Sequence, residues 1–256
     1  MNKKFLTFGL AVAISMLMMV NPANGQDSGV LAAENFGGST AFTTEYMLRG
    51  LSFTDGDPAV QSSLEYAHSS GFYMGIWGSN ASIADGNVEM DGFAGFAGAM
   101  GDIGYDVTAL YYTYPPGEVN LPDSTTFNPN FFELFLGLSY GLPVGGDMAP
   151  EVGVGYYFSP NYTMEDGVAH YLNGTLDIGL PMGLGAGVGF GYQTVAGGEF
   201  TPDGYSYSHY RVSLSKDLAG FTLDASYHGT DEDAKDTFGD LADSKFVLTL
   251  SRGFGF

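Results

Sequence analysis

The stretch that decides the fold closes the chain: Phe246-Val247-Leu248-Thr249-Leu250-Ser251-Arg252-Gly253-Phe254-Gly255-Phe256. Its large apolar residues share one parity, and they are Phe246, Leu248, Leu250, Phe254 and Phe256. Strands alternate in this way when one face meets lipid and the other faces a lumen. An alternating strand that ends on an aromatic ring is typical of bacterial outer-membrane β-barrels. We therefore expect Phe254 and Phe256 to act as an assembly signal, and Arg252 to lie at the membrane rim, where its charge can reach water.

The N-terminal residues are typical of a secretory signal peptide. Lys3 and Lys4 form a positive n-region, an apolar stretch follows, and small residues occupy 23–25. A transmembrane anchor is the alternative, and it is disfavoured because the apolar run is short for a bilayer and a polar segment follows it. The expected organisation is a signal peptide over 1–25, a periplasmic N-terminal tail over 26–38 and an outer-membrane β-barrel over 39–256.

The composition excludes several functions. The chain has no cysteine, which excludes disulfide staples, cysteine metal ligands and thiol catalysis. Beyond Lys3 and Lys4, six basic residues face 29 acidic ones, for a net charge of −23. Binding of nucleic acid through its phosphates needs cationic groups, so no nucleic acid is expected as a partner. The 39 glycines, 20 Phe and 17 Tyr suit strands, tight turns and interfacial aromatic girdles.

Alternation with a period of two recurs beyond residue 38, and no helical period competes with it. Apolar residues take one parity and polar residues the other, as with Leu134 and Leu136 against Glu133. In the first segment Tyr46 and Leu48 continue the apolar face. The twelve predicted strands are 39–48, 59–68, 72–80, 87–99, 104–114, 130–141, 150–158, 168–180, 184–193, 204–216, 221–229 and 243–256.

The connections between these strands alternate in length. The long ones are 49–58, 81–86, 115–129, 159–167, 194–203 and 230–242, and the short ones are 69–71, 100–103, 142–149, 181–183 and 217–220. Outer-membrane barrels have short periplasmic turns and longer external loops. A soluble β-sandwich is the alternative, but it gives no reason for the alternation. We therefore expect an all-β fold, a transmembrane antiparallel up-and-down β-barrel of about twelve strands.

Several motifs resemble the TorF-like porins of proteobacteria. The sharpest are YMLRGLS at 46–52, DPAVQ at 57–61, GFYMGIWGSN at 71–80, YDV at 105–107 and YYTYP at 111–115. The closing run 246–252 also fits the family. Glu45 stands where the family has an aspartate, and the chain runs two residues past the usual terminal Phe. The resemblance implies a porin, which is a class of channel, and it names no solute.

Parity places charged residues inside the predicted barrel. The acids are Glu45, Glu65, Glu89, Asp91, Asp106, Glu133, Asp177 and Asp224, and the bases are Arg211 and Lys245. Pairing cannot neutralise eight acids with two bases, and unpaired buried carboxylates are costly. This favours a hydrated pore whose acidic lining prefers cations. The alternative is structural, with acids paired to the few bases or with a plugged lumen.

Two other groups of residues suggest chemistry. Asp224, Ser226 and His228 share the inward parity, but side chains on one strand face point roughly parallel, so a polar lumen wall is favoured over a lipid-hydrolysing site. The acidic loop 231–243 lacks the EF-hand pattern, so a solvated loop is favoured over a Ca²⁺ site. We expect no catalytic residue, no metal and no cofactor.

These features together predict a passive outer-membrane channel for small hydrophilic solutes that prefers cations. The alternatives are a non-conducting structural or adhesin-like barrel and, less favoured, a barrel hydrolase that acts on lipid. The expected partners are outer-membrane lipid, lipopolysaccharide, the barrel-assembly machinery during biogenesis, and the solutes themselves. Twelve strands fall between eight, which side chains fill, and sixteen, which leave a wide channel, so strand number alone does not fix the pore width.

Overall fold

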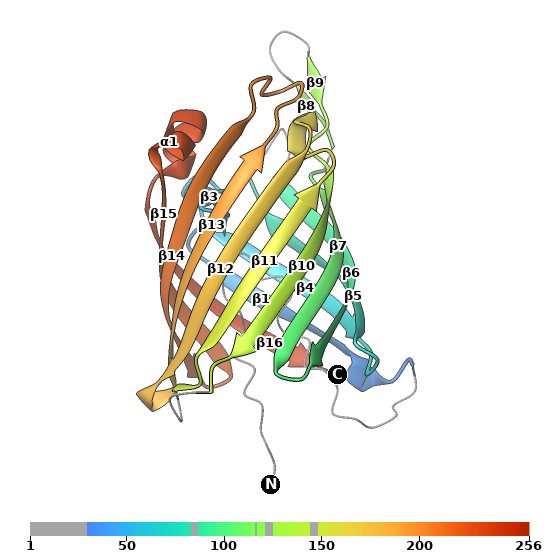
Figure 1. Cartoon of the computed structure of the whole chain (residues 1–256), viewed down its shortest axis with the longest axis vertical. Coiled ribbons are helices and arrows are strands. Elements are labelled where there is room, and N and C mark those ends of the chain that lie inside the picture. The colour runs from blue at the N-terminus through green and yellow to red at the C-terminus, as the bar shows by residue number, and fades with distance from the viewer. Residues whose placement is uncertain (1–29, 83–86, 116, 121–124, 144–147, 256) are drawn as a thin grey trace.

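The computed structural model describes residues 30–82, 87–115, 117–120, 125–143 and 148–255. Twelve antiparallel strands form a closed β-barrel, which Figure 1 shows with its long axis vertical. Consecutive barrel strands are neighbours in the wall, and the ring closes where the first strand pairs with the last. The predicted fold class is therefore confirmed. The predicted signal peptide, residues 1–25, lies outside the described residues.

The barrel strands are 8 to 14 residues long, which matches the length that a tilted strand needs to cross a bilayer. Their bounds are β1 (Phe36–Thr43), β4 (Ala59–Ala67), β5 (Phe72–Asn80), β6 (Val88–Met100), β7 (Ile103–Thr113), β10 (Phe131–Gly141), β11 (Glu151–Ser159), β12 (Ala169–Leu180), β13 (Leu184–Val195), β14 (Tyr205–Leu218), β15 (Phe221–Thr230) and β16 (Lys245–Gly255).

Short elements lie in the connections. They are the hairpin of β2 (Met47–Leu48) with β3 (Leu51–Ser52), the hairpin of β8 (Val119–Asn120) with β9 (Thr126–Phe127), helix α1 (Glu232–Phe238), and the 3-10 turns η1 (Ala33–Asn35), η3 (Thr163–Glu165), η4 (Pro181–Gly183) and η5 (Gly239–Ala242). None of the described helices is both long and apolar enough to span a membrane.

The two ends of the barrel differ in the length of their connections. At the short-turn end, β6 passes to β7 and β14 to β15 through turns at 101–102 and 219–220. The long-loop end carries the longer connections 44–58, 81–87, 114–130, 160–168, 196–204 and 231–244. Helix α1 and the β8–β9 hairpin lie toward this end in Figure 1. The alternation predicted from sequence is present.

The outer face of the wall is apolar. Leu64 on β4 and Ile76 on β5 are cross-strand partners, and both are about half exposed, at 52% and 54%. Other exposed outward residues are Phe42, Met74, Val107, Leu134, Leu136, Leu138, Val154, Leu172, Val188, Val212, Leu214, Leu223, Leu248 and Leu250. Such a continuous apolar belt fits contact with lipid, as the parity analysis predicts.

Aromatic side chains border this belt near both ends. Near the short-turn end, the rings of Phe36 and Tyr66 are 5.2 Å apart, and those of Phe72 and Phe96 are 5.4 Å apart. Toward the long-loop end the exposed tyrosines are Tyr111, Tyr156, Tyr192, Tyr210 and Tyr227. Two aromatic girdles of this kind mark the interfaces of a membrane barrel. Arg252 faces outward over the ring of Phe221, at 5.1 Å, in agreement with a place near the rim.

The alternating glycines of β13 have a packing role. An added Cβ at Gly191 would come within 2.5 Å of the Tyr171 hydroxyl and 2.3 Å of His209 Nε2. At Gly187 it would meet Asp177 Oδ1 at 2.7 Å. The glycines therefore give room to side chains that lean over β13 from the neighbouring strands β12 and β14.

Two details of the predicted secondary structure are wrong. The first strand, expected over 39–48, spans 36–43, and Tyr46 and Leu48 leave the wall because the chain turns inward after Thr43. The loop near 230–242, expected to contain no helix, contains α1. Asp231 begins this helix by accepting a hydrogen bond from the Ala234 N–H, and the backbone N–H of Gly239 closes it.

Candidate functional site

The segment 44–58 folds into the barrel instead of covering its rim. Met47 pairs with Ser52 and Leu48 with Leu51, so Arg49 and Gly50 form a two-residue turn at the tip. Both tip residues have positive φ, 51° and 83°, as a tight type I′-like turn requires. We call residues 44–56 the inner hairpin.

Aromatic contacts hold the base of the inner hairpin to the wall. The Tyr46 ring lies 5.2 Å from that of Phe53 and 5.5 Å from that of Trp77 on β5. The Tyr46 N–H donates to Thr54 Oγ1 at 3.0 Å. Glu45 accepts from the Gly56 N–H at 3.1 Å, and Lys245 Nζ lies 3.6 Å from the same oxygen. The hairpin is therefore packed and hydrogen bonded at its base.

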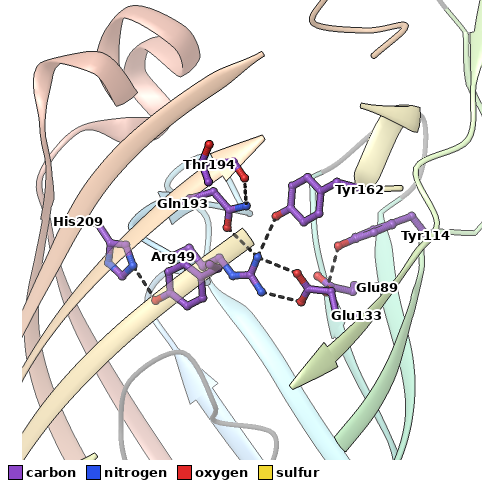
Figure 2. A network of polar contacts seen from close by, with 9 residues as sticks. Arg49, Glu89, Tyr114, Glu133, Tyr162, Gln193, Thr194 and His209 are labelled. Atoms are coloured by element: carbon purple, nitrogen blue, oxygen red, sulfur yellow. Dashed lines mark hydrogen bonds and ion pairs between the residues drawn. The ribbon is translucent and has the colours of Figure 1, made fainter. Parts of the chain in front are cut away.

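Arg49 at the tip binds the far wall. Its Nη1 and Nη2 donate to Glu133 Oε1 and Oε2 of β10 at 3.0 and 2.6 Å. Nη1 also donates to Gln193 Oε1 of β13 at 2.8 Å (Figure 2). Bidentate pairing of this kind combines charge with fixed geometry. Arg49 and Glu133 are both buried, so the pair is sheltered from solvent screening.

An aromatic cradle completes the arginine site. The guanidinium carbon lies 4.3 Å from the ring centre of Tyr171 and 4.9 Å from that of Tyr157. Tyr162, in the loop after β11, accepts from Arg49 Nη1 at 3.4 Å. Burial raises the pKa of Tyr162 to about 12, so its hydroxyl stays neutral beside the arginine. The cradle binds a cation through ring faces and hydroxyl groups.

His209 fixes the last part of the cradle. Its ring stacks on Tyr171, with 5.7 Å between ring centres, and Tyr171 Oη lies 2.8 Å from His209 Nε2. A Cβ on Gly50 would lie 2.5 Å from His209 Cβ, so only glycine fits at the tip. Figure 2 shows His209 beside the Arg49 site.

The inner hairpin crosses the lumen. β11 stands six places from β1 in the ring of twelve strands, which is the opposite side of the wall. Arg49 starts from the loop after β1 and contacts β10, β11, β12 and β13. Buried rings fill the space around it, and they are Tyr46, Trp77, Tyr112, Tyr114, Phe131, Tyr157, Tyr162 and Tyr171. We call this layer, near the long-loop end, the aromatic layer.

Below the aromatic layer, toward the short turns, the lumen is polar. Arg211 Nη2 donates to Asp224 Oδ1 at 2.6 Å, across β14 and β15. Asp106 accepts from Tyr73 and Thr108 at 2.6 and 2.7 Å. Glu65 accepts from Ser63 at 2.7 Å. These acids, together with Asp177, are only partly buried. The buried ring of Tyr73 packs against that of Phe93 in the same half.

The structure thus separates the predicted lumen residues into two groups. Glu65, Asp106, Asp177, Arg211 and Asp224 lie in the polar half. The others belong to the aromatic layer or its edge, and they are Glu45, Glu89, Asp91, Glu133 and Lys245. Glu89 and Asp91 are 0% and 2% exposed.

Parity analysis missed the central residue, Arg49, which adds a third base to the interior. It follows an alternating run and precedes Gly50, so it reads as the start of an outer loop. Two features of the sequence could have indicated an inward hairpin. Arg49-Gly50 is a two-residue turn between short apolar segments, and it lies inside the motif YMLRGLS.

Asp224, Ser226 and His228 do not form a catalytic triad. Ser226 Oγ lies 3.1 Å from His228 Nε2, but Asp224 is bound to Arg211 and does not orient the histidine. In the acidic loop, Asp231 caps α1 and also accepts from the Ser208 N–H at 2.6 Å. No group of three or more His, Cys, Asp or Glu side chains that could hold a metal ion is found within the described ranges.

The C-terminal residues close the barrel. Phe254 pairs with Gly38 of β1, and its ring occupies the space that a Cβ on Gly38 would need. It faces outward and is 43% exposed. Phe256, the other half of the expected assembly signal, lies outside the described residues.

Comparison with known proteins supports the architecture. A family model described as "Bacterial protein of unknown function (Gcw_chp)" matches residues 26–254. No curated protein matches the sequence. Among solved structures, the KdgM porin is 10% identical with a TM-score of 0.53, over 86% of this chain and 99% of that chain. The NanC porin is 9% identical with a TM-score of 0.52, over the same shares of the two chains. At such identities the likeness shows the fold alone.

Proposed function

The chain belongs to the Gcw_chp family of bacterial proteins, and we propose that it is an outer-membrane channel for small hydrophilic solutes. One observation carries the proposal: a closed twelve-stranded wall is apolar outside, and beyond the aromatic layer it is lined inside by many polar and charged side chains. Polar groups without partners are costly in a dry interior, so a polar lining is favoured where water or solute enters the barrel. The porin-like fold and the resemblance to TorF-like porins support the same class.

We further propose that the channel prefers cations. Eight acids and three bases, Arg49, Arg211 and Lys245, occupy the interior. Three ion pairs join Arg49 to Glu133, Arg211 to Asp224 and Lys245 to Glu45. The remaining acids, among them Glu65, Asp106 and Asp177, give the polar half a negative potential that attracts cations.

The inner hairpin makes the passage narrow. Its tip and the surrounding rings fill the long-loop half of the lumen, whereas the half toward the short turns is lined by the polar residues described above. We propose that Arg49 holds the channel in a low-conductance state, and that solute passes when the tip leaves Glu133. Passage of this kind requires no catalysis.

The proposed surroundings follow from the wall. The apolar belt would contact outer-membrane lipid, the long loops would meet lipopolysaccharide, and the short turns would face the periplasm. We also propose that Phe254 and Phe256 are read by the barrel-assembly machinery. Removal of residues 254–256 should lower the amount of heat-modifiable protein in the outer membrane without blocking secretion, as fractionation and unheated gels would show. Normal assembly of the truncated protein would show that these residues are not an assembly signal.

Recording in planar bilayers tests the channel proposal. Purified protein under a KCl gradient should give small conductance steps and a reversal potential on the cation side. Anion preference at low salt would overturn the charge argument. If the wild-type protein and an Arg49 variant were both silent, a structural barrel would replace the channel.

A further inference from the structure

Two carboxyl groups in the aromatic layer have no counter-charge. Glu89 and Asp91 lie two residues apart on the inward face of β6, so their side chains point the same way, with Cα atoms roughly 7 Å apart. Asp91 stands opposite Trp77 of β5 and Tyr112 of β7. Both acids are almost completely buried. The site is thus enclosed by the wall and by rings.

Most of their oxygen atoms lack a donor. Glu89 Oε1 accepts from the Tyr114 hydroxyl at 3.2 Å. Among the described residues, Glu89 Oε2 and both carboxylate oxygens of Asp91 have no hydrogen-bond partner. This observation goes beyond the mere proximity of two acids, because buried polar atoms without partners are rare in native proteins.

The interior bases are engaged elsewhere. Arg49 binds Glu133, and Lys245 lies beside Glu45. Arg211 binds Asp224 in the polar half. Two buried carboxylates without compensation would be strongly destabilising. One proton shared between the two carboxyl groups would neutralise one of them but would leave one negative charge buried among rings, whereas one divalent cation neutralises both carboxylates.

We propose that Glu89 and Asp91 form a calcium site inside the barrel wall. Two carboxylates supply up to four oxygens, and the hydroxyl groups of Tyr46 and Tyr114, which both interact with Glu89, supply two more. Six oxygens meet the lower limit for Ca²⁺. Mg²⁺ fits less well because it demands a strict octahedron and keeps several waters, which an enclosed aromatic site does not accommodate.

The site would join the base of the inner hairpin to the wall. Tyr46 belongs to the hairpin, and Tyr114 follows β7. A bound ion would therefore strengthen the aromatic layer at β6, two strands along the wall from β10, which carries Glu133. The inference concerns binding and stability, so it holds whether or not the barrel conducts.

Calcium titration of the folded protein tests this site. Protein stripped with EDTA in detergent should bind one Ca²⁺ per chain in isothermal titration, and its unfolding temperature should rise with Ca²⁺. The variant E89Q/D91N should lose at least tenfold in affinity and show no shift. The control E65Q/D106N removes two acids from the polar half and should bind like the wild type.

Two results would overturn the proposal. Wild-type protein that binds no Ca²⁺ at millimolar concentration would show that protons neutralise the pair. Unchanged binding by E89Q/D91N would place the ion on the acidic loops. If E89Q/D91N fails to give a heat-modifiable barrel, Tyr114→Phe replaces it: it removes one oxygen without changing charge and should weaken Ca²⁺ binding, and unchanged affinity would count against the site.

Discussion

The two halves of the lumen share one wall but differ in content. Toward the long loops, an inserted hairpin and large rings surround a bidentate arginine pair, and the side chains are buried. Toward the short turns, glycine, serine, threonine and partly exposed acids line the same strands, with the buried rings of Tyr73 and Phe93 among them. Strand number sets the width of the wall, but the inward residues decide how much of that width is filled.

This contrast assigns different tasks to the two halves. In the proposed channel, the aromatic layer would limit the size of the passage because it is held together by packing and a buried ion pair. The polar half would set the preference for charge because its acids are only partly buried. Variants in each half should therefore change different measured properties.

The largest effect is expected from Arg49→Met. The change leaves Glu133 buried without its partner, and breaking a buried pair in this way costs about 3–5 kcal/mol. The tip should leave the far wall, so single-channel conductance should rise several-fold in planar bilayers.

Two controls accompany this variant. Arg252→Met removes an outward arginine and should leave conductance unchanged. The double variant R49M/E133Q removes both charges. Its free energy of unfolding should return part of the way to that of the wild type, because the uncompensated carboxylate is gone. If R49M and wild type conduct alike, the arginine does not hold the passage closed.

A smaller effect on stability is expected when alanine replaces Gly50 or Gly56, which both have positive φ. Alanine in such a conformation costs roughly 1–2 kcal/mol at either position. Gly50→Ala should cost about 1–3 kcal/mol more, because its Cβ would meet His209 whereas nothing lies within 4 Å at Gly56. Urea unfolding in detergent measures the difference. Equal losses would mean that the tip does not pack against His209.

The smallest effect concerns the polar half. The variant E65Q/D106N should shift the reversal potential toward zero under a KCl gradient while conductance changes little. The shift should be clear near 0.1 M salt, where the Debye length is about 10 Å, and should fade at 1 M, where it is about 3 Å. A larger shift at 1 M than at 0.1 M would contradict an electrostatic origin.

The barrel itself could be predicted from sequence because lipid imposes a period of two on every strand. Leu64, Ile76 and Leu136 face outward as their parity requires. The inner hairpin could not be predicted in the same way. Tyr46 and Leu48 continue the alternation of β1, and alternation cannot distinguish a strand in the wall from a hairpin inside it.

The contacts inside the barrel could not be predicted from sequence for a similar reason. Parity correctly assigned Glu133 to the inside, but its partner Arg49 is 84 positions away and lies in a connection. Helix α1 could have been predicted from the sequence, since Asp231 at its start and Gly239 at its end are ordinary capping residues.

Replacement of residues 45–56 by a short Gly-Ser linker tests the central claim most directly, because it removes the inner hairpin and leaves all twelve strands. A matched control shortens the loop 196–204 instead. We predict a heat-modifiable barrel with single-channel conductance several-fold above wild type, and no change in the control. A folded barrel without the hairpin whose conductance equals that of wild type would contradict the account.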